Sequence, residues 1–175
     1  MEKIDIYTDG SSKGNPGPGG FGAIIIKNNN QSQSASRETQ VREIGGREEQ
    51  TTNNRMEMQA AIESLKYLNN NLSVGSQVKL HTDSEYLLKG ATIWIQGWVK
   101  NGWRTKNKKE VLNQDLWQLL LYEIEKVKEK GNLTWEKVLG HSGHKFNERC
   151  DRIATSFAEG EAVKLYEGYY ERYKI

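Results

Sequence analysis

The 175-residue sequence has a single cysteine, only two prolines and no long apolar run. The lone Cys150 excludes an internal disulfide framework and is typical of a reducing compartment, so we expect a cytoplasmic protein in which this thiol is a packing group. The longest apolar stretch lies around residues 24–26, far short of the roughly 18 to 20 residues of a membrane-spanning helix. We therefore expect neither a membrane anchor nor, because the sequence enters a strand-like pattern at once, a signal peptide.

Acidic residues are absent from one segment, residues 86–109, although the formal net charge of the whole chain is only +2. This segment combines three of the five tryptophans with six basic side chains. They are Trp94, Trp98 and Trp103, and Lys89, Lys100, Arg104, Lys106, Lys108 and Lys109. Because flat rings interleaved with cations suit a phosphate backbone, the segment indicates a nucleic-acid partner.

Two short segments alternate apolar and polar side chains, and both run into Thr-Asp. Residues 4–8 and 78–82 have the period of two that is typical of half-buried strands, and Asp9 and Asp83 follow them. We therefore expect the two carboxylates to occupy equivalent positions at strand ends.

Further strands are predicted between these two. A glycine-rich turn at residues 14–20 holds both prolines and predicts a hairpin into a strand at 21–27. Residues 39–44 have weak strand character and predict a third antiparallel strand, whereas residues 28–50 as a whole look like a long polar loop.

The pattern becomes helical from residue 55, where apolar side chains recur every three or four residues as far as residue 68. We expect Asn53 or Asn54 to cap this helix and Glu57 to lie in its first turn. The later elements are predicted as helices at 84–98 and 113–130, a strand at 133–139 and a helix from 147 to 158 that contains Asp151.

This order of elements predicts an α/β fold with a five-stranded mixed sheet, three antiparallel strands followed by parallel ones, flanked by helices. With 35% hydrophobic residues, the chain is long enough for one core and short for two, so we expect one domain over residues 1–175. Residues 164–175 form a tyrosine-rich C-terminal tail to which the pattern assigns no role.

Four acids lie beside apolar stripes of these elements: Asp9, Glu57, Asp83 and Asp151. Any one of them alone is most simply a surface acid or a helix cap, because the chain has 23 acids. If the four converge, their repulsion favours binding of a hard cation such as Mg²⁺ or Mn²⁺. Two such ions can hold an attacking water and a leaving oxygen in line across a phosphodiester.

Other kinds of site fit less well. His141, His144 and Cys150 could suggest zinc, but the sequence has no CxxC pair and only three histidines. The glycine-rich residues 14–22 lack the Lys-Ser/Thr of a P-loop, and no GxSxG nucleophile elbow is present.

Taken together, five segments resemble cellular ribonuclease H type 1, in that family's order and over roughly residues 4–158. They are Tyr7-Thr8-Asp9-Gly10-Ser11, Gly14-Asn15-Pro16-Gly17-Pro18-Gly19-Gly20, Thr51-Thr52-Asn53-Asn54-Arg55-Met56-Glu57, Thr82-Asp83-Ser84, and Gly140-His141-Ser142-Gly143-His144 with Asn147-Glu148-Arg149-Cys150-Asp151. The resemblance implies a ribonuclease H-like fold and an endonuclease that cuts the RNA strand of RNA–DNA hybrids by two-metal-ion catalysis, leaving 3′-hydroxyl and 5′-phosphate ends. It implies two Mg²⁺ ions per site, with Mn²⁺ as a substitute, and we expect a monomer.

The resemblance also implies roles for single residues. Asp9 would bridge both ions, Glu57 and Asp83 would hold the ion nearer the leaving group, and Asp151 would help to hold the ion that activates water. His141 matches a loop histidine that assists proton transfer or product release, although a solvated loop residue is the simpler alternative. His144 is interpreted as structural, orienting the loop.

Twelve residues match substrate contacts of the family. Asn15, Asn53 and Asn54 would lie in the minor groove, where amides can read 2′-hydroxyls, and Thr52 would contact a DNA phosphate. The others match a basic protrusion that grips the hybrid: Trp94, Trp98, Lys100, Trp103, Arg104, Lys106, Lys108 and Lys109. For the tryptophans, and for Trp94 above all, a place in the core is the alternative.

One departure from the family pattern is Glu85, which stands where many relatives have a groove-contacting glutamine, so a substrate role is in doubt for it. Two other functions remain open: an integrase- or transposase-like nuclease that acts on DNA, and a catalytically inactive module that binds nucleic acid. The intact set of four acids favours an enzyme over the latter.

Overall fold

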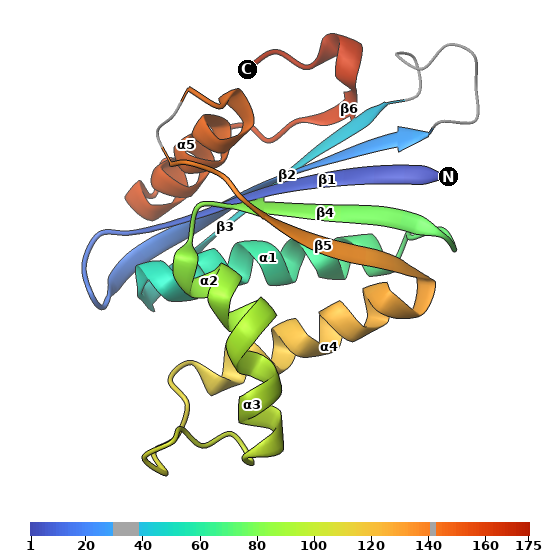
Figure 1. Ribbon diagram of the computed structural model, residues 1–175. Coiled ribbons are helices and arrows are strands. Elements are labelled where there is room, and N and C mark those ends of the chain that lie inside the picture. Colours follow the sequence, from blue (N-terminus) through green and yellow to red (C-terminus); the bar gives the residue numbers. More distant parts are fainter. Residues whose placement is uncertain (30–38, 141–142) are drawn as a thin grey trace.

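The computed structural model spans residues 1–175 and describes residues 1–29, 39–140 and 143–175. A twisted mixed sheet forms the centre of the molecule (Figure 1). Its strands are β1 (Glu2–Ser12), β2 (Gly17–Asn29), β3 (Gln40–Thr51), β4 (Ser76–Thr82), β5 (Gly131–Lys137) and β6 (Glu167–Tyr169).

The strand order is β5-β4-β1-β2-β3-β6. Strands β1, β4 and β5 are parallel, whereas β2, β3 and β6 each pair antiparallel with the preceding neighbour in the sheet. The predicted mixed α/β architecture is therefore confirmed. The predicted number of five strands was wrong, because the C-terminal tail adds β6 to the edge of β3.

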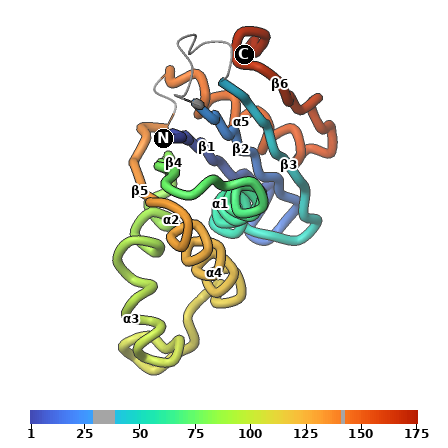
Figure 2. Tube along the Cα trace, turned by 90° about the vertical axis from the view of Figure 1, so that its right-hand side faces the viewer, coloured from blue at the N-terminus to red at the C-terminus, as the bar shows by residue number. Residues whose placement is uncertain are grey.

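Helices cover both faces of the sheet (Figures 1 and 2). Helices α1 and α4 lie on one face and α5 on the other, while α2, a π-helical turn and α3 lead away from the sheet beside α4. The bounds are α1 Asn53–Asn69, α2 Glu85–Lys89, the π-helical turn Gly90–Trp94, α3 Ile95–Lys100, α4 Gln114–Lys130, α5 Lys145–Glu159 and a 3₁₀ turn at Tyr170–Arg172.

The alternation along β1 distributes its side chains between the two faces. Ile4 and Ile6 are buried in the larger core, together with α1 and the fully buried Trp117 of α4. Tyr7 belongs to a smaller cluster with Cys150 of α5, which confirms that the lone thiol is packed in the interior. Gly90 lies against Trp117, and any Cβ at this position would overlap the indole ring.

Strand β3 shows where local pattern was misleading. It extends from Gln40 to Thr51, so the third antiparallel strand predicted at 39–44 is confirmed, but the interpretation of residues 28–50 as a long loop was wrong for residues 40–50. Eight of its twelve residues are polar or charged, and it also includes Gly45 and Gly46; both features disguise a strand in the sequence. Pairing with β2 along its length stabilises the extended conformation.

Other boundaries also differ from expectation. The predicted helix at 84–98 is divided by the π-helical turn, and the expected elements at 133–139 and 147–158 begin two residues earlier, as β5 and α5. Within the described ranges 1–29, 39–140 and 143–175, every helix is too short or too polar to cross a membrane.

Candidate active site

Asp9 and Asp83 are brought together by the parallel pairing of β1 with β4. Thr8 lies opposite Thr82 at the end of this ladder, so each aspartate follows its strand partner in register. Asp83 comes directly after β4, as predicted. Asp9 does not end its strand, because β1 continues to Ser12 through antiparallel pairing with β2.

Glu57 comes from α1, which packs closely against β1. A Cβ on Gly10 would overlap the backbone of Met56 and Glu57, so the absence of a side chain at Gly10 permits this approach. Thr52, not Asn53 or Asn54, is the N-cap and accepts a hydrogen bond from the Arg55 amide at 3.3 Å. Glu57 therefore lies beyond the first turn, where its side chain faces β1.

Each of the three carboxylates offers one oxygen within 4.8 Å of the others. Asp9 is 7% exposed and Glu57 is 4% exposed, while Asp83 is half-buried. Glu57 Oε2 is buried and has no hydrogen-bond partner among the described residues. The Asp9 carboxylate accepts a hydrogen bond from the Gly10 amide at 2.8 Å.

Burial and mutual repulsion raise the pKa values of the clustered acids. Burial, together with the charges of Asp83 and Asp151, raises the pKa of Asp9 from 3.8 to about 7. Burial and the charges of Asp9 and Asp83 also raise the pKa of Glu57 well above its ordinary value. Such a cluster favours binding of a divalent cation, which would relieve the repulsion.

Asp151 lies on α5 and is half-buried. Its charge acts on Asp9, but it is not among the three acids whose oxygens lie within 4.8 Å of one another. Sequence reasoning gave no role to its neighbour Asn147, which is 3% exposed and donates a hydrogen bond to Asp83 Oδ2 at 3.3 Å. The only sequence signal for it was its position in the Asn147-Glu148-Arg149-Cys150-Asp151 segment.

The loop between β5 and α5 passes beside Asp83. A Cβ on Gly140 would lie 2.7 Å from Asp83 Oδ2, so this glycine allows the loop to approach the carboxylate. His141 lies outside the described residues. His144 occupies the N-cap position of α5, and its ring centroid lies 5.1 Å from that of Tyr7.

The expected minor-groove residues lie at two places. Asn53 and Asn54 are at the N-terminus of α1, exposed and half-buried respectively, and Asn15 is exposed in the turn between β1 and β2. The Thr52 hydroxyl, expected at a phosphate, is also used in the cap of α1.

The basic segment forms a protruding arm, residues 95–110, at the end of α3 (Figures 1 and 2). Its cationic side chains are exposed, namely Lys100, Arg104, Lys106, Lys108 and Lys109. Arg104 and Lys106 line a groove of about 570 Å³ together with Trp94 and Trp98.

The three tryptophans differ in their surroundings. Trp98 and Trp103 are partly buried against the main core, so part of each ring is structural. Trp94 is 37% exposed, and its ring centroid lies 5.8 Å from that of Trp98. Trp94 is thus the most accessible of the three.

Glu85 points into solvent from the first turn of α2 and pairs with Lys89 at 3.1 Å and with Lys137. Hydrogen bonds from Lys137 and Lys89 lower its pKa to about 2. Its charge is thus compensated within the protein, which reduces repulsion of a nearby phosphate.

Comparisons with known proteins agree with this geometry. Residues 1–159 match the family model described as RNase H. The "Ribonuclease H" of Hahella chejuensis is 48% identical over 154 residues, covering 88% of this chain and 92% of that protein, and the one of Thermosynechococcus vestitus is 47% identical over 160 residues, covering 91% of each.

Two solved structures show the same fold. LC9-RNase H1, described as a type 1 RNase H with the type 2 active-site motif, has a TM-score of 0.78 at 28% identity, covering 98% of this chain and 80% of that one. LC11-RNase H1 in complex with an RNA/DNA hybrid has a TM-score of 0.58 at 24% identity, covering 90% and 97%. The chain belongs to the ribonuclease H family of hydrolases, as a type 1 member.

Proposed function

We propose that this protein is an endonuclease that hydrolyses the RNA strand of RNA–DNA hybrids with two Mg²⁺ ions, leaving 3′-hydroxyl and 5′-phosphate ends. The observation that supports the proposal most directly is the meeting of Asp9, Glu57 and Asp83 within 4.8 Å. The family membership supports the substrate class, as does the hybrid bound to LC11-RNase H1.

The residues present fit a divalent metal. The cluster consists only of carboxylates, which are the hard oxygen ligands that Mg²⁺ and Mn²⁺ prefer. The buried Glu57 Oε2, which has no hydrogen-bond partner among the described residues, would gain one in a cation. A cation would also favour the charged form of the Asp9 carboxyl, whose pKa is raised. Asp9, Glu57 and Asp83 would hold metal directly, and Asp151 would contribute from α5.

The bound ions would supply Lewis-acid activation of water and stabilise the charge on the leaving oxygen. The protein's own groups position this chemistry. Gly10 donates its amide to Asp9, and Asn147 donates to Asp83, so two of the carboxylates are oriented by hydrogen bonds before metal binds. His141 is proposed to assist proton transfer or product release.

Substrate binding is proposed to use two surfaces. Asn15, Asn53 and Asn54 would read 2′-hydroxyls in the minor groove, and the Thr52 hydroxyl would contact a DNA phosphate. The protruding arm, through Trp98, Trp103 and the cations Lys100, Arg104, Lys106, Lys108 and Lys109, would contact the phosphate backbone together with the adjacent Trp94.

The test is a substrate panel. The protein is incubated with an RNA–DNA hybrid, double-stranded RNA and double-stranded DNA, each with Mg²⁺ and with EDTA. We expect cleavage of the RNA strand of the hybrid only, and only with Mg²⁺. Cleavage of double-stranded DNA would instead support an integrase- or transposase-like nuclease, and binding without cleavage would support an inactive nucleic-acid-binding module.

A further inference from the structure

The carboxylate of Glu43, on β3, is completely buried and is not one of the three clustered acids. Arg149 of α5 donates two hydrogen bonds to it, from Nε at 2.7 Å and from Nη2 at 2.8 Å. The Tyr173 hydroxyl donates a third at 2.6 Å, and the Tyr166 amide donates a fourth at 2.9 Å. A buried carboxylate with four donors is a fully satisfied and costly arrangement to disturb.

These bonds connect three parts of the chain: β3, α5 and the C-terminal tail. Arg149 Nη2 also donates to the Lys164 carbonyl at 3.2 Å, so the guanidinium bridges Glu43 and the tail. We call Glu43, Arg149, Tyr166 and Tyr173 the Glu43 hub. The hub lies on the face of β3 that is turned toward α5.

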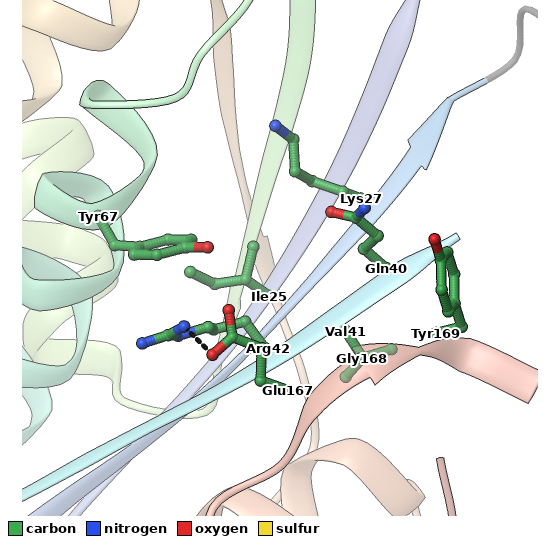
Figure 3. A pocket seen from close by; sticks show the side chains of 9 residues that line it. All are labelled: Ile25, Lys27, Gln40, Val41, Arg42, Tyr67, Glu167, Gly168 and Tyr169. Atoms are coloured by element: carbon green, nitrogen blue, oxygen red, sulfur yellow. Dashed lines mark ion pairs between the residues drawn. The ribbon is translucent and has the colours of Figure 1, made fainter. Parts of the chain in front are cut away.

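The tail also contacts β3 at a second place, apart from the Glu43 hub. Strand β6 pairs with β3, and Glu167 forms an ion pair with Arg42, whose guanidinium carbon lies 4.9 Å from the centre of the Tyr67 ring. Figure 3 shows this ion pair beside Tyr67 at a cavity of about 210 Å³. Glu167 thus anchors the tail to β3, through Arg42.

The hub is coupled to the carboxylate cluster through the first turns of α5. Arg149 is two residues from Asn147, which donates to Asp83, and two residues from Asp151, whose charge acts on Asp9. A helix transmits a displacement rigidly over so short a distance. Any shift of Arg149 therefore moves both side chains relative to the cluster.

We propose that the Glu43 hub is a positioning device, closed by the C-terminal tail, that holds α5 where Asp151 and Asn147 complete the metal site. The inference rests on the proposed metal-dependent function. It assigns a role in metal affinity to residues that touch neither metal nor substrate. Its alternative is a hub that stabilises the fold and leaves the metal site unchanged.

Binding of Mn²⁺ to the folded protein, measured by titration calorimetry, distinguishes a hub that positions the metal site from a hub that only stabilises the fold. In Glu43→Gln the new amide NH₂ opposes the donors that surround it, so we expect binding about tenfold weaker, the lower end of what loss of an outer-sphere contact costs. Tyr173→Phe removes one hydroxyl and should weaken binding less. Cleavage should require more Mg²⁺ in both variants and recover at excess Mg²⁺, with KM for the hybrid unchanged.

Matched controls are provided by tail residues that do not belong to the Glu43 hub. Glu167→Gln removes a tail carboxylate that pairs with Arg42 of β3 and not with the Glu43 hub, and Tyr169→Phe removes an exposed tail hydroxyl, so both should bind Mn²⁺ within about twofold of the unmodified protein. Equal binding by Glu43→Gln and the unmodified protein would overturn the inference.

If Glu43→Gln does not fold, as judged by circular dichroism, the Mn²⁺ affinities of Tyr173→Phe and Tyr169→Phe are compared instead. Equal Mn²⁺ affinities of these two variants would overturn the inference. Failure of the unmodified protein to bind Mn²⁺ would instead contradict the proposed function.

Discussion

At the residue scale, the cluster depends on how closely α1 approaches β1. Gly10 follows Asp9 directly, and its lack of a side chain leaves room for the backbone at Glu57. Side-chain chemistry alone would not bring a helix glutamate to a strand aspartate. The distance between the two carboxylates is therefore set by a glycine that takes no part in the chemistry.

Gly10→Ala should separate Glu57 from Asp9. The added methyl overlaps helix backbone, which cannot rotate away, so we expect a loss of about 1 to 3 kcal/mol in the free energy of unfolding and weaker metal binding. Gly97→Ala is the matched control, since a Cβ on this helical residue meets nothing within 4 Å. Urea denaturation and Mn²⁺ titration of both variants check this, and equal stability of the two would refute it.

The raised pKa of Asp9 predicts how stability depends on pH in the metal-free protein. Since the folded value of about 7 exceeds the ordinary value of 3.8, the folded state binds the proton more tightly. This stabilisation is fully present below about pH 4 and is lost as the pH rises through about 7. Glu57, whose pKa is raised as well, acts in the same direction.

Thermal unfolding in EDTA between pH 4 and pH 8 measures this effect, which should be on the order of 4 kcal/mol for Asp9, since each pKa unit corresponds to about 1.4 kcal/mol. Asp9→Asn should flatten the decline, and saturating Mg²⁺ should do the same in the unmodified protein. An identical decline in Asp9→Asn and the unmodified protein in EDTA would show that Asp9 does not carry the raised pKa.

At the scale of elements, the protruding arm is separate from the carboxylate cluster in sequence and in its contacts. Its lysines are exposed, so their charges are available to a phosphate backbone. Arg104 is held near Glu110, at 4.0 Å, and its guanidinium also donates to the Lys108 carbonyl at 3.4 Å. We therefore expect the arm to contribute affinity and not chemistry.

Replacing Lys106, Lys108 and Lys109 by alanine should raise KM steeply and leave kcat nearly unchanged, because binding shared by the ground and transition states is lost. Each lost phosphate contact should flatten the plot of log affinity against log salt by up to about 0.9, giving a change of roughly 1 to 3. Initial rates at several hybrid concentrations and two salt concentrations check this.

Alanine at Lys66, Lys128 and Lys174 removes the same charge from exposed positions elsewhere and should have a much smaller effect. A solvated charge run would leave KM and the salt slope unchanged in both triple variants. An unchanged KM with a collapsed kcat in the arm variant would contradict both interpretations.

The sequence predicted best the elements whose pattern is local. The strands that lead to Asp9 and Asp83 alternate regularly, and helix α1 has an apolar stripe, so their positions could be derived from periodicity. Only the first half of strand β3 was predicted, at 39–44; its polar second half has no regular alternation and is extended through pairing with β2. The division of 84–98 by a π-helical turn likewise reflects packing of Gly90 against Trp117, a partner distant in sequence.

At the scale of the whole molecule, the site is assembled from contacts that no local pattern contains. The hydrogen bond from Asn147 to Asp83 joins residues 64 positions apart in the sequence, and the one from Tyr173 to Glu43 joins residues 130 positions apart. The tail therefore had no predictable role, although the structure places it at the edge of the sheet and against α5. The convergence of the acids could be suspected from their number but needed the fold to bring three of them within 4.8 Å.

The central claim is that the clustered carboxylates act through metal on an RNA–DNA hybrid, and Mg²⁺-dependent cleavage by Asp9→Asn tests it most directly. The substitution preserves the shape of the side chain and removes the charge that a cation would bind. Cleavage should fall to the level of a control without enzyme, while circular dichroism and hybrid binding stay close to those of the unmodified protein. Substantial Mg²⁺-dependent cleavage by this folded variant would contradict the account.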